Sequence, residues 1–246
     1  MASVVFIASI SSVYGQDAFE ALVDPAVAAS VSADIYVRQV EDKVFDYDRQ
    51  LHPSCGDRRM AAWTDFRPVD DPLTRDYQRR GAARTYRQQV KVEGCDAPPR
   101  LHNLVVVTAR DATHPPVLTA GVPGTTRTWP HLQYNVQQFL LGYALKQSSG
   151  LCLEAYRKGE TRPVIVEARF EKEIEPIENA TGAMIADGVW TEVWTARLCE
   201  RTFREAFLFE AEPSGGASYA LLAGRAPDRT LKDMRETAQN APVGGQ

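Results

Sequence analysis

The sequence WTEVWTARLC carries the residues best suited to chemistry in this chain. On an extended strand alternate side chains share a face, so Trp190, Glu192 and Trp194 are expected to lie together. A carboxyl group between two indoles is shielded from water, which raises its pKa and would let it act as an acid or base. In such an enzyme Glu192 would act together with the cationic side chain of Arg169 or Arg197.

A structural interpretation of the same stretch competes with the catalytic one. Glu192 would pair with an arginine across the strand, and the two tryptophans would pack beneath a helix as the wall of a sheet. Aromatic cross-strand pairs are common in sheets, so we favour this interpretation and predict no catalytic residue.

The sequence PGTTRTWP, residues 123–130, is a second candidate site because its threonines and Arg127 precede a predicted helix. Backbone N–H groups at such a place can hold an anion together with the arginine. A helix-entry loop capped by a threonine explains the same residues, and we favour it. The candidate ligand-binding residues are therefore Arg127, Trp190, Glu192 and Trp194.

Other motifs point away from common enzyme classes. The sequence has no G-x-S-x-G elbow, no P-loop and no G-x-G-x-x-G turn, so no cofactor is predicted. His52 lies near Cys55 and His102 near Cys95, but neither spacing is that of a zinc site, so no metal is predicted. A net charge of −4 gives no electrostatic basis for binding nucleic acid.

Four cysteines, none in a C-x-x-C pair, indicate two disulfides in an oxidising compartment. Their number alone allows three connectivities. An internal similarity favours one of them: Tyr86 precedes Cys95, and Trp190 precedes Cys199, by the same distance (95 − 86 and 199 − 190 are both nine). The matched order predicts Cys55–Cys95 in one half of the chain and Cys152–Cys199 in the other.

Each half also has a helical stripe before its first cysteine and a strand pattern after it. The first stripe is Ile35, Val40, Val44, Tyr47 and Leu51; the second is Leu132, Val136, Phe139, Leu140 and Tyr143. Pro130 suits the first turn of the second helix. Each half therefore reads as one helix followed by four strands, with its two cysteines around the first pair of strands.

These patterns predict an α+β fold of two tandem αββββ repeats, each a helix packed on an antiparallel sheet and stapled by a disulfide. The first repeat covers residues 17–120 and the second covers 121–225. Residues 226–246 have few apolar side chains and are predicted to be a flexible tail.

The first 16 residues resemble a truncated signal segment. Residues 4–10 are apolar, and Val13 and Gly15 are placed as in a signal-peptidase site, although the basic start of a full signal is missing. No segment is apolar enough to span a membrane. We therefore predict a periplasmic or secreted location.

The sequences PGTTRTWPHLQYNV, GVWTEVWTARLC and PSGGASY resemble a family of uncharacterised secreted proteins from proteobacteria. The resemblance covers roughly residues 121–220. It departs at Glu200, where the family has a glycine after the cysteine. The resemblance implies secretion and a disulfide, and it brings no activity.

Three classes of function remain, in this order. The first is a non-catalytic envelope protein that binds a protein or a small apolar ligand. The second is an enzyme that uses Glu192 as acid or base. The third is a cystatin-like inhibitor, which shares the plan of a helix on a four-stranded antiparallel sheet, although the chain lacks the glutamine-valine-containing inhibitory loop of such inhibitors.

Overall fold

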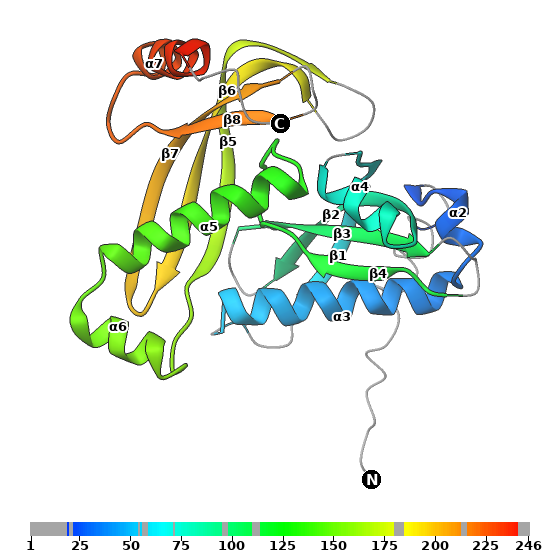
Figure 1. Ribbon diagram of the computed structural model, residues 1–246. Helices are drawn as coiled ribbons and strands as arrows, with labels where there is room; N and C mark the ends of the chain where they lie inside the picture. The colour runs from blue at the N-terminus through cyan, green and yellow to red at the C-terminus, as the bar shows by residue number, and fades with distance from the viewer. Residues whose placement is uncertain are drawn as a thin grey trace. The chain divides into compact units, whose positions relative to one another are not determined.

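Two compact units make up the chain in the computed structural model (Figure 1). The first consists of Met1–Val69 and Thr74–Gly121, and the second of Asp70–Leu73 and Val122–Gln246. The structure describes residues 19, 22–53, 55, 59–70, 72–94, 98–109, 114–179, 185–212 and 216–240. The predicted signal segment, residues 1–16, lies outside the described residues.

The first unit is a helix on a four-stranded antiparallel sheet. Its helices are α2 (Pro25–Ala28) and α3 (Ala33–Leu51). The strands pair in the order β1-β2-β3-β4: β1 (Arg59–Pro68), β2 (Ala82–Gly94), β3 (Arg100–Ala109) and β4 (Val117–Ala120). Helix α4 (Pro72–Arg79) lies between β1 and β2 in the chain.

The core of the first unit joins one face of α3 to one face of this sheet. On α3 the buried residues recur at helical spacing, and on β2 every second residue from Tyr86 to Val92 is buried. Each element therefore buries one face against the other. The ring of Tyr36 meets Trp63 edge-on, and its hydroxyl donates to Gln88 inside the core. The buried members of this core include Phe19, Val27, Tyr36, Val40, Val44, Tyr86, Val90, Val92 and Leu104.

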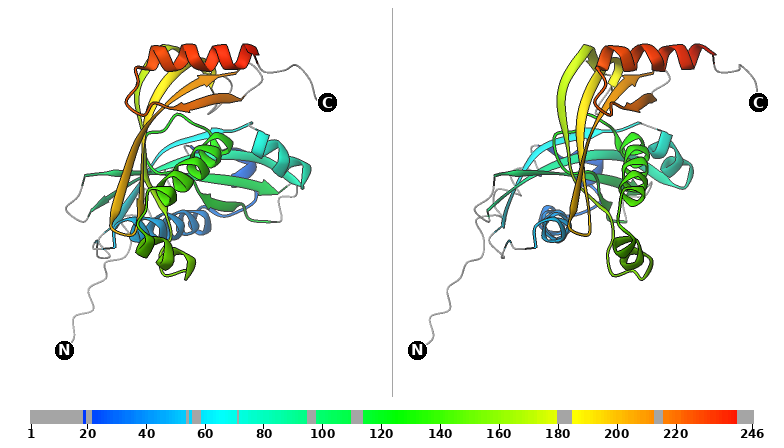
Figure 2. Two further views of the ribbon diagram at one scale, coloured as in Figure 1. Left: turned by 60° about the vertical axis from the view of Figure 1, so that its left-hand side comes forward. Right: turned by 90° about the vertical axis from the view of Figure 1, so that its left-hand side faces the viewer.

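The second unit also runs from a long helix into a four-stranded antiparallel sheet, and its other helices lie elsewhere in the order. Helices α5 (Pro130–Lys146) and α6 (Gly150–Arg157) precede the sheet, and α7 (Pro227–Asn240) follows it. The strands pair antiparallel in the order β5-β6-β7-β8: β5 (Val164–Asn179), β6 (Ile185–Leu198), β7 (Arg201–Ala211) and β8 (Ala217–Leu221). Figure 2 shows that α7 and α6 lie toward opposite ends of the long strands.

Helix α7 occupies residues that the sequence predicts as a flexible tail, 226–246. Leu231 is buried in a small core with Val189, Leu208 and Leu222. Side chains alternate between the two faces of a strand, so Val189 and Leu208 lie on the face of the sheet that does not carry Trp190. Two apolar side chains of α7, the buried Leu231 and the partly buried Met234, thus pack against the sheet, and ion pairs of Arg235 with Glu175 and Glu210 reinforce the attachment of this mostly polar helix.

The predicted fold class is confirmed: both halves run from a helix into a four-stranded antiparallel sheet. The predicted disulfide between Cys152 and Cys199 is also present. Cys55 is disulfide-bonded as well. Its predicted partner, Cys95, lies outside the described residues.

Two positions of the predicted helical stripes differ from the structure. Ile35 is 44% exposed, and the neighbouring Tyr36 is buried in its place. Phe139 is also 44% exposed, and its ring contacts Phe207 and Tyr219 only edge-on. Each lies at the border of its stripe, where a small rotation of the helix decides which neighbour enters the core.

Among the described helices, none combines the length and the apolar character needed to cross a lipid bilayer.

Candidate functional site

Strand β6 brings the three predicted residues of its central stretch together on one face. Trp190, Glu192 and Trp194 are all completely buried. On the neighbouring strand β7, Phe209 stacks on Trp190 with ring centroids 5.2 Å apart, and Phe207 lies opposite Glu192. The carboxyl group therefore lies within an aromatic core.

Four hydrogen bonds converge on the carboxyl group of Glu192. Oε1 accepts from the backbone N–H of Arg127 at 2.7 Å and from the indole Nε1 of Trp190 at 3.1 Å. Oε2 accepts from the hydroxyl of Thr126 at 2.7 Å and from Nε1 of Trp194 at 2.9 Å. Each oxygen thus has two donors, which is the number of lone pairs it offers.

The pKa of Glu192 is raised above its ordinary value of 4.5 because burial penalises the charged form. The hydrogen bonds from Thr126, Arg127, Trp190 and Trp194 oppose this shift because they favour the carboxylate. A raised pKa satisfies one requirement of a catalytic acid. The second requirement is access to a substrate, and complete burial denies it.

The prediction that an arginine side chain pairs with Glu192 is wrong. Arg127 contributes its backbone N–H, while its guanidinium lies over the ring of Phe170, 5.2 Å from the centroid. Arg169 pairs in register with Val193, and Arg197 lies an odd number of residues from Glu192, so both belong to the other face of the sheet. Arg169 and Arg197, the predicted cationic partners, therefore lie on the face of the sheet away from the carboxyl group of Glu192.

The loop of residues 123–128 is fixed to the sheet by backbone groups as well as by Glu192. The carbonyl of Pro123 accepts from the N–H of Ala168 on β5 at 2.7 Å. The hydroxyl of Thr125 accepts from the N–H of Phe170 at 3.2 Å. The loop therefore lies along strand β5, whose pairing with β6 is irregular on either side of Ala168.

Gln133, in the first turn of α5, holds the two ends of this loop together. Its Nε2 donates to the carbonyl of Thr128 at 2.8 Å, and its Oε1 accepts from the N–H of Val122 at 3.1 Å. The hydroxyls of Thr126 and Thr128 also bond to each other at 2.6 Å. Thr126 is one of the threonines of residues 123–130 that the sequence analysis names as a second candidate site, whereas Gln133 is a member of the site that the sequence patterns do not single out.

Gly124 is required by this arrangement, and alanine at this position is expected to destabilise the second unit. Its φ is +109°, and a Cβ would lie 2.2 Å from the carbonyl oxygen of Ala168. Backbone strain and a clash with another backbone atom should together cost Gly124→Ala more than about 2 kcal/mol. Chemical denaturation followed by tryptophan fluorescence measures this, because three of the four tryptophans lie in the second unit.

The control for that variant is Gly142→Ala. Gly142 lies within helix α5, where an added methyl group would meet no other atom within 4 Å, and its φ is not positive. Alanine there should stabilise the helix by about 0.5–1 kcal/mol. Equal effects of the two substitutions would contradict the close approach of the loop to β5.

The first unit contains a second buried polar cluster, built on Asp48. Arg100 binds both carboxylate oxygens of Asp48, at 2.7 and 2.9 Å, and His102 Nε2 lies 3.0 Å from Oδ1. Asp48 is completely buried and His102 is 1% exposed. The cluster joins α3 to β3. It is a bidentate ion pair extended by a histidine, and its burial leaves no face for a ligand.

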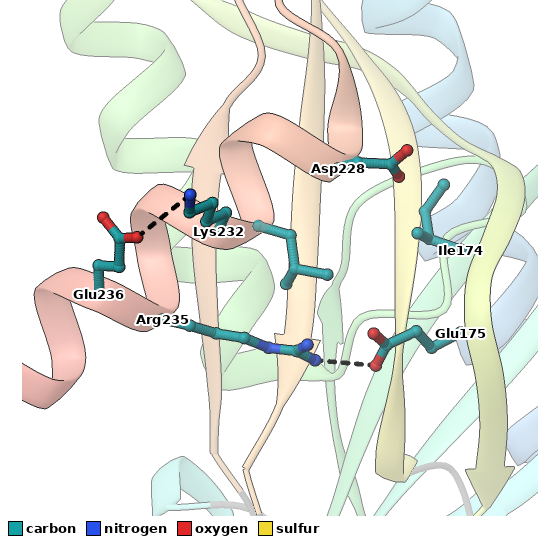
Figure 3. A pocket seen from close by; sticks show the side chains of 7 residues that line it. Ile174, Glu175, Asp228, Lys232, Arg235 and Glu236 are labelled. Atoms are coloured by element: carbon teal, nitrogen blue, oxygen red, sulfur yellow. Dashed lines mark hydrogen bonds and ion pairs between the residues drawn. The ribbon is translucent and has the colours of Figure 1, made fainter.

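A shallow groove between α7 and β5 is the third place with clustered charges (Figure 3). Arg235 binds Glu175 at 2.8 Å and Glu210 at 2.6 Å, and these carboxylates raise the pKa of Arg235. Lys232 lies 3.7 Å from Glu236 on the same helix. Four of the five charged side chains that line the groove, all but Asp228, are thus in ion pairs, and those of Arg235 attach α7 to the sheet.

The described residues contain no group of three or more His, Cys, Asp or Glu side chains placed to hold a metal ion.

Comparison with known proteins gives no match, whether to protein-family models, to curated proteins or to solved structures.

Proposed function

We propose that the chain is a non-catalytic binding protein of an oxidising compartment, secreted or periplasmic. One observation carries this proposal. The carboxyl group best placed for acid–base chemistry, that of Glu192, is completely buried and has both oxygens occupied by donors of its own unit. A general acid must come within hydrogen-bond reach of its substrate, so the arrangement favours a structural role for Glu192.

Exposed apolar side chains on the first two helices of the second unit support a binding role. Tyr134 on α5 is 57% exposed, and Leu151 on α6 is 82% exposed. Leu141 and Leu145 on α5 are only half-buried. Helix α5 is therefore apolar on its outer side as well as on the side that faces the sheet, which is unusual for a surface helix without a partner. We propose that this surface, defined by Tyr134, Leu141, Leu145 and Leu151, binds the apolar side chains of a protein partner.

The disulfides support the proposed compartment. The bonded state of Cys55, Cys152 and Cys199 fits an oxidising environment, as does the resemblance to secreted proteobacterial proteins inferred from the sequence. The cystatin-like alternative shares only the helix on a four-stranded antiparallel sheet with this fold, so it stays a prediction.

Affinity capture with matched variants tests the proposed surface. The protein is immobilised and exposed to the secreted and envelope fractions of the cells that produce it. A partner retained by the wild type should be lost, at least tenfold, with the double variant Tyr134→Asp/Leu151→Asp. Thr202→Asp, at an exposed position of β7 that pairs with Arg197 and so lies on the other face of the sheet, adds the same kind of charge and should retain it. Retention that is equal with all three proteins would overturn the proposal.

A further inference from the structure

Helix α6 is attached to the second unit by very little apolar packing. Cys152 is the only buried residue among its eight. Leu151 is 82% exposed and Tyr156 is 39% exposed. A helix of this length is far below the roughly 12–15 residues at which isolated helices become marginally stable in water, so its order depends on its attachments.

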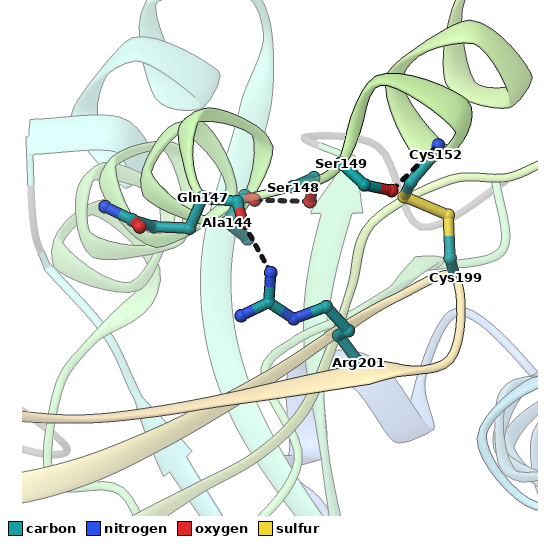
Figure 4. The surroundings of a disulfide bond; sticks show 7 residues. All are labelled: Ala144, Gln147, Ser148, Ser149, Cys152, Cys199 and Arg201. Carbon is teal, nitrogen blue, oxygen red and sulfur yellow. Dashed lines mark hydrogen bonds between the residues drawn. A yellow bond between two sulfur atoms is a disulfide. The ribbon is translucent and has the colours of Figure 1, made fainter.

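The strongest attachment is covalent (Figure 4). The disulfide links Cys152 in α6 to Cys199, 47 residues away in the turn between β6 and β7. Ser149 caps the helix by accepting from the N–H of Cys152 at 3.4 Å. Arg201, at the start of β7, donates to the carbonyl of Gln147 just before the helix.

The turn that carries Cys199 is itself held in an unfavourable conformation. Leu198 pairs with Arg201, so only Cys199 and Glu200 connect the two strands. Cys199 has a φ of +53°, a left-handed backbone conformation that residues other than glycine rarely adopt. The disulfide therefore joins a weakly packed helix to a strained turn.

We propose that the Cys152–Cys199 disulfide is a redox-sensitive tether whose reduction releases α6 while the sheet and the Glu192 network stay folded. This inference does not depend on the identity of any binding partner. The reductant is a dithiol, as a class. Its first thiolate attacks the sulfur of Cys199, because the residue Cys199 is half-buried whereas Cys152 is buried.

The reaction then balances as a thiol–disulfide exchange. The S–S bond breaks, a mixed disulfide forms on Cys199, and Cys152 leaves as a thiolate that takes up a proton. The second thiol of the reductant displaces Cys199, which also ends as a thiol. The protein gains two electrons and two protons, and the dithiol is oxidised to its own disulfide.

The release is expected to be local because the core of the second unit does not use α6. The aromatic cluster on β6 and β7 packs against the buried face of α5, formed by Leu132, Val136, Leu140 and Ala144. The hydrogen bonds to Glu192 come from the loop before α5 and from β6 itself. Reduction leaves all of these groups in place.

Hydrogen–deuterium exchange of the full chain tests the tether. The double variant Cys152→Ser/Cys199→Ser leaves the disulfide of Cys55 intact and has no new free thiol. Amides of residues 150–157 should exchange at least tenfold faster than in the oxidised wild type, while amides of β6 and β7 keep their protection. Trypsin should cleave after Arg157 at least tenfold faster.

Dithiothreitol added to the wild type should reproduce the faster exchange of residues 150–157, and reoxidation should restore protection. Leu151→Ala removes an exposed side chain of the same helix and should leave the exchange unchanged. Two results would overturn the proposal: unchanged protection of α6 in the serine variant, or loss of protection in β6 and β7 together with α6.

Discussion

Replacing Glu192 with glutamine is expected to lower the free energy of unfolding of the second unit by about 2–4 kcal/mol, because buried donors lose their acceptors. The amide has one oxygen where the carboxylate has two. If its NH₂ takes the place of Oε2, it faces the indole N–H of Trp194; if it takes the place of Oε1, it faces the N–H groups of Arg127 and Trp190. Either orientation leaves at least one buried donor unsatisfied.

Denaturant unfolding followed by tryptophan fluorescence measures this penalty. The control is Glu167→Gln on β5, an exposed position where the same change should cost within about 0.5 kcal/mol. The structural interpretation of the sequence, with Glu192 paired to an arginine across the strand, would limit the cost to about 1 kcal/mol. A value in that lower range would contradict the four-donor arrangement.

The difference in stability between wild type and Glu192→Gln also depends on pH, because at this position only the wild-type carboxyl group titrates. The pKa of Glu192 is raised in the folded state by burial, above its ordinary value of 4.5. Its stabilising contribution is therefore complete below that ordinary value and is lost as the pH rises through the folded-state pKa. The difference in stability between wild type and Glu192→Gln should therefore shrink as the pH is raised above that ordinary value.

Trp194→Ala is expected to cost about 3–5 kcal/mol, the range for truncating a large buried aromatic side chain. Trp194 is completely buried, its ring meets Phe207 edge-on at 6.4 Å, and its Nε1 donates to Glu192. The substitution therefore opens a cavity and removes one of the four donors to a buried carboxyl group. Both changes act on the centre of the same core.

Thermal melts of Trp194→Ala and of Tyr134→Ala separate core packing from surface packing. Tyr134 is more than half exposed, and its truncation should change stability by less than about 1 kcal/mol. A Trp194→Ala protein as stable as the wild type would show that the indole faces solvent or a ligand, and the structural role assigned to this strand would fail.

The sequence was sufficient for the fold class because it depends on short-range patterns. Alternation placed Trp190, Glu192 and Trp194 on one face, and matched cysteine spacing identified the Cys152–Cys199 pair. The partners of Glu192 could not be predicted in the same way. Thr126 and Arg127 lie 66 and 65 residues earlier, and their approach depends on the path of a loop.

The Asp48 cluster was missed for a different reason. Asp48 follows Val40 and Val44 at intervals of four on α3, so it lies on the buried face of the helix. A charged residue in an apolar stripe signals a buried partner, and Arg100 and His102 on β3 supply it. Helix α7 was missed because its pattern is mostly polar, and its order depends on contacts with the sheet.

The long separation between the 123–128 loop and Glu192 has a consequence for synthesis of the chain. At about 5–20 residues per second, translation needs roughly 3–13 seconds to extend the chain from the loop to Glu192. During that interval the apolar face of α5 has been made, but β6 and β7, which cover it, have not. Folding of the second unit therefore waits for its own C-terminal half, and until then the apolar face of α5 is exposed on the nascent chain, where chaperones can bind it.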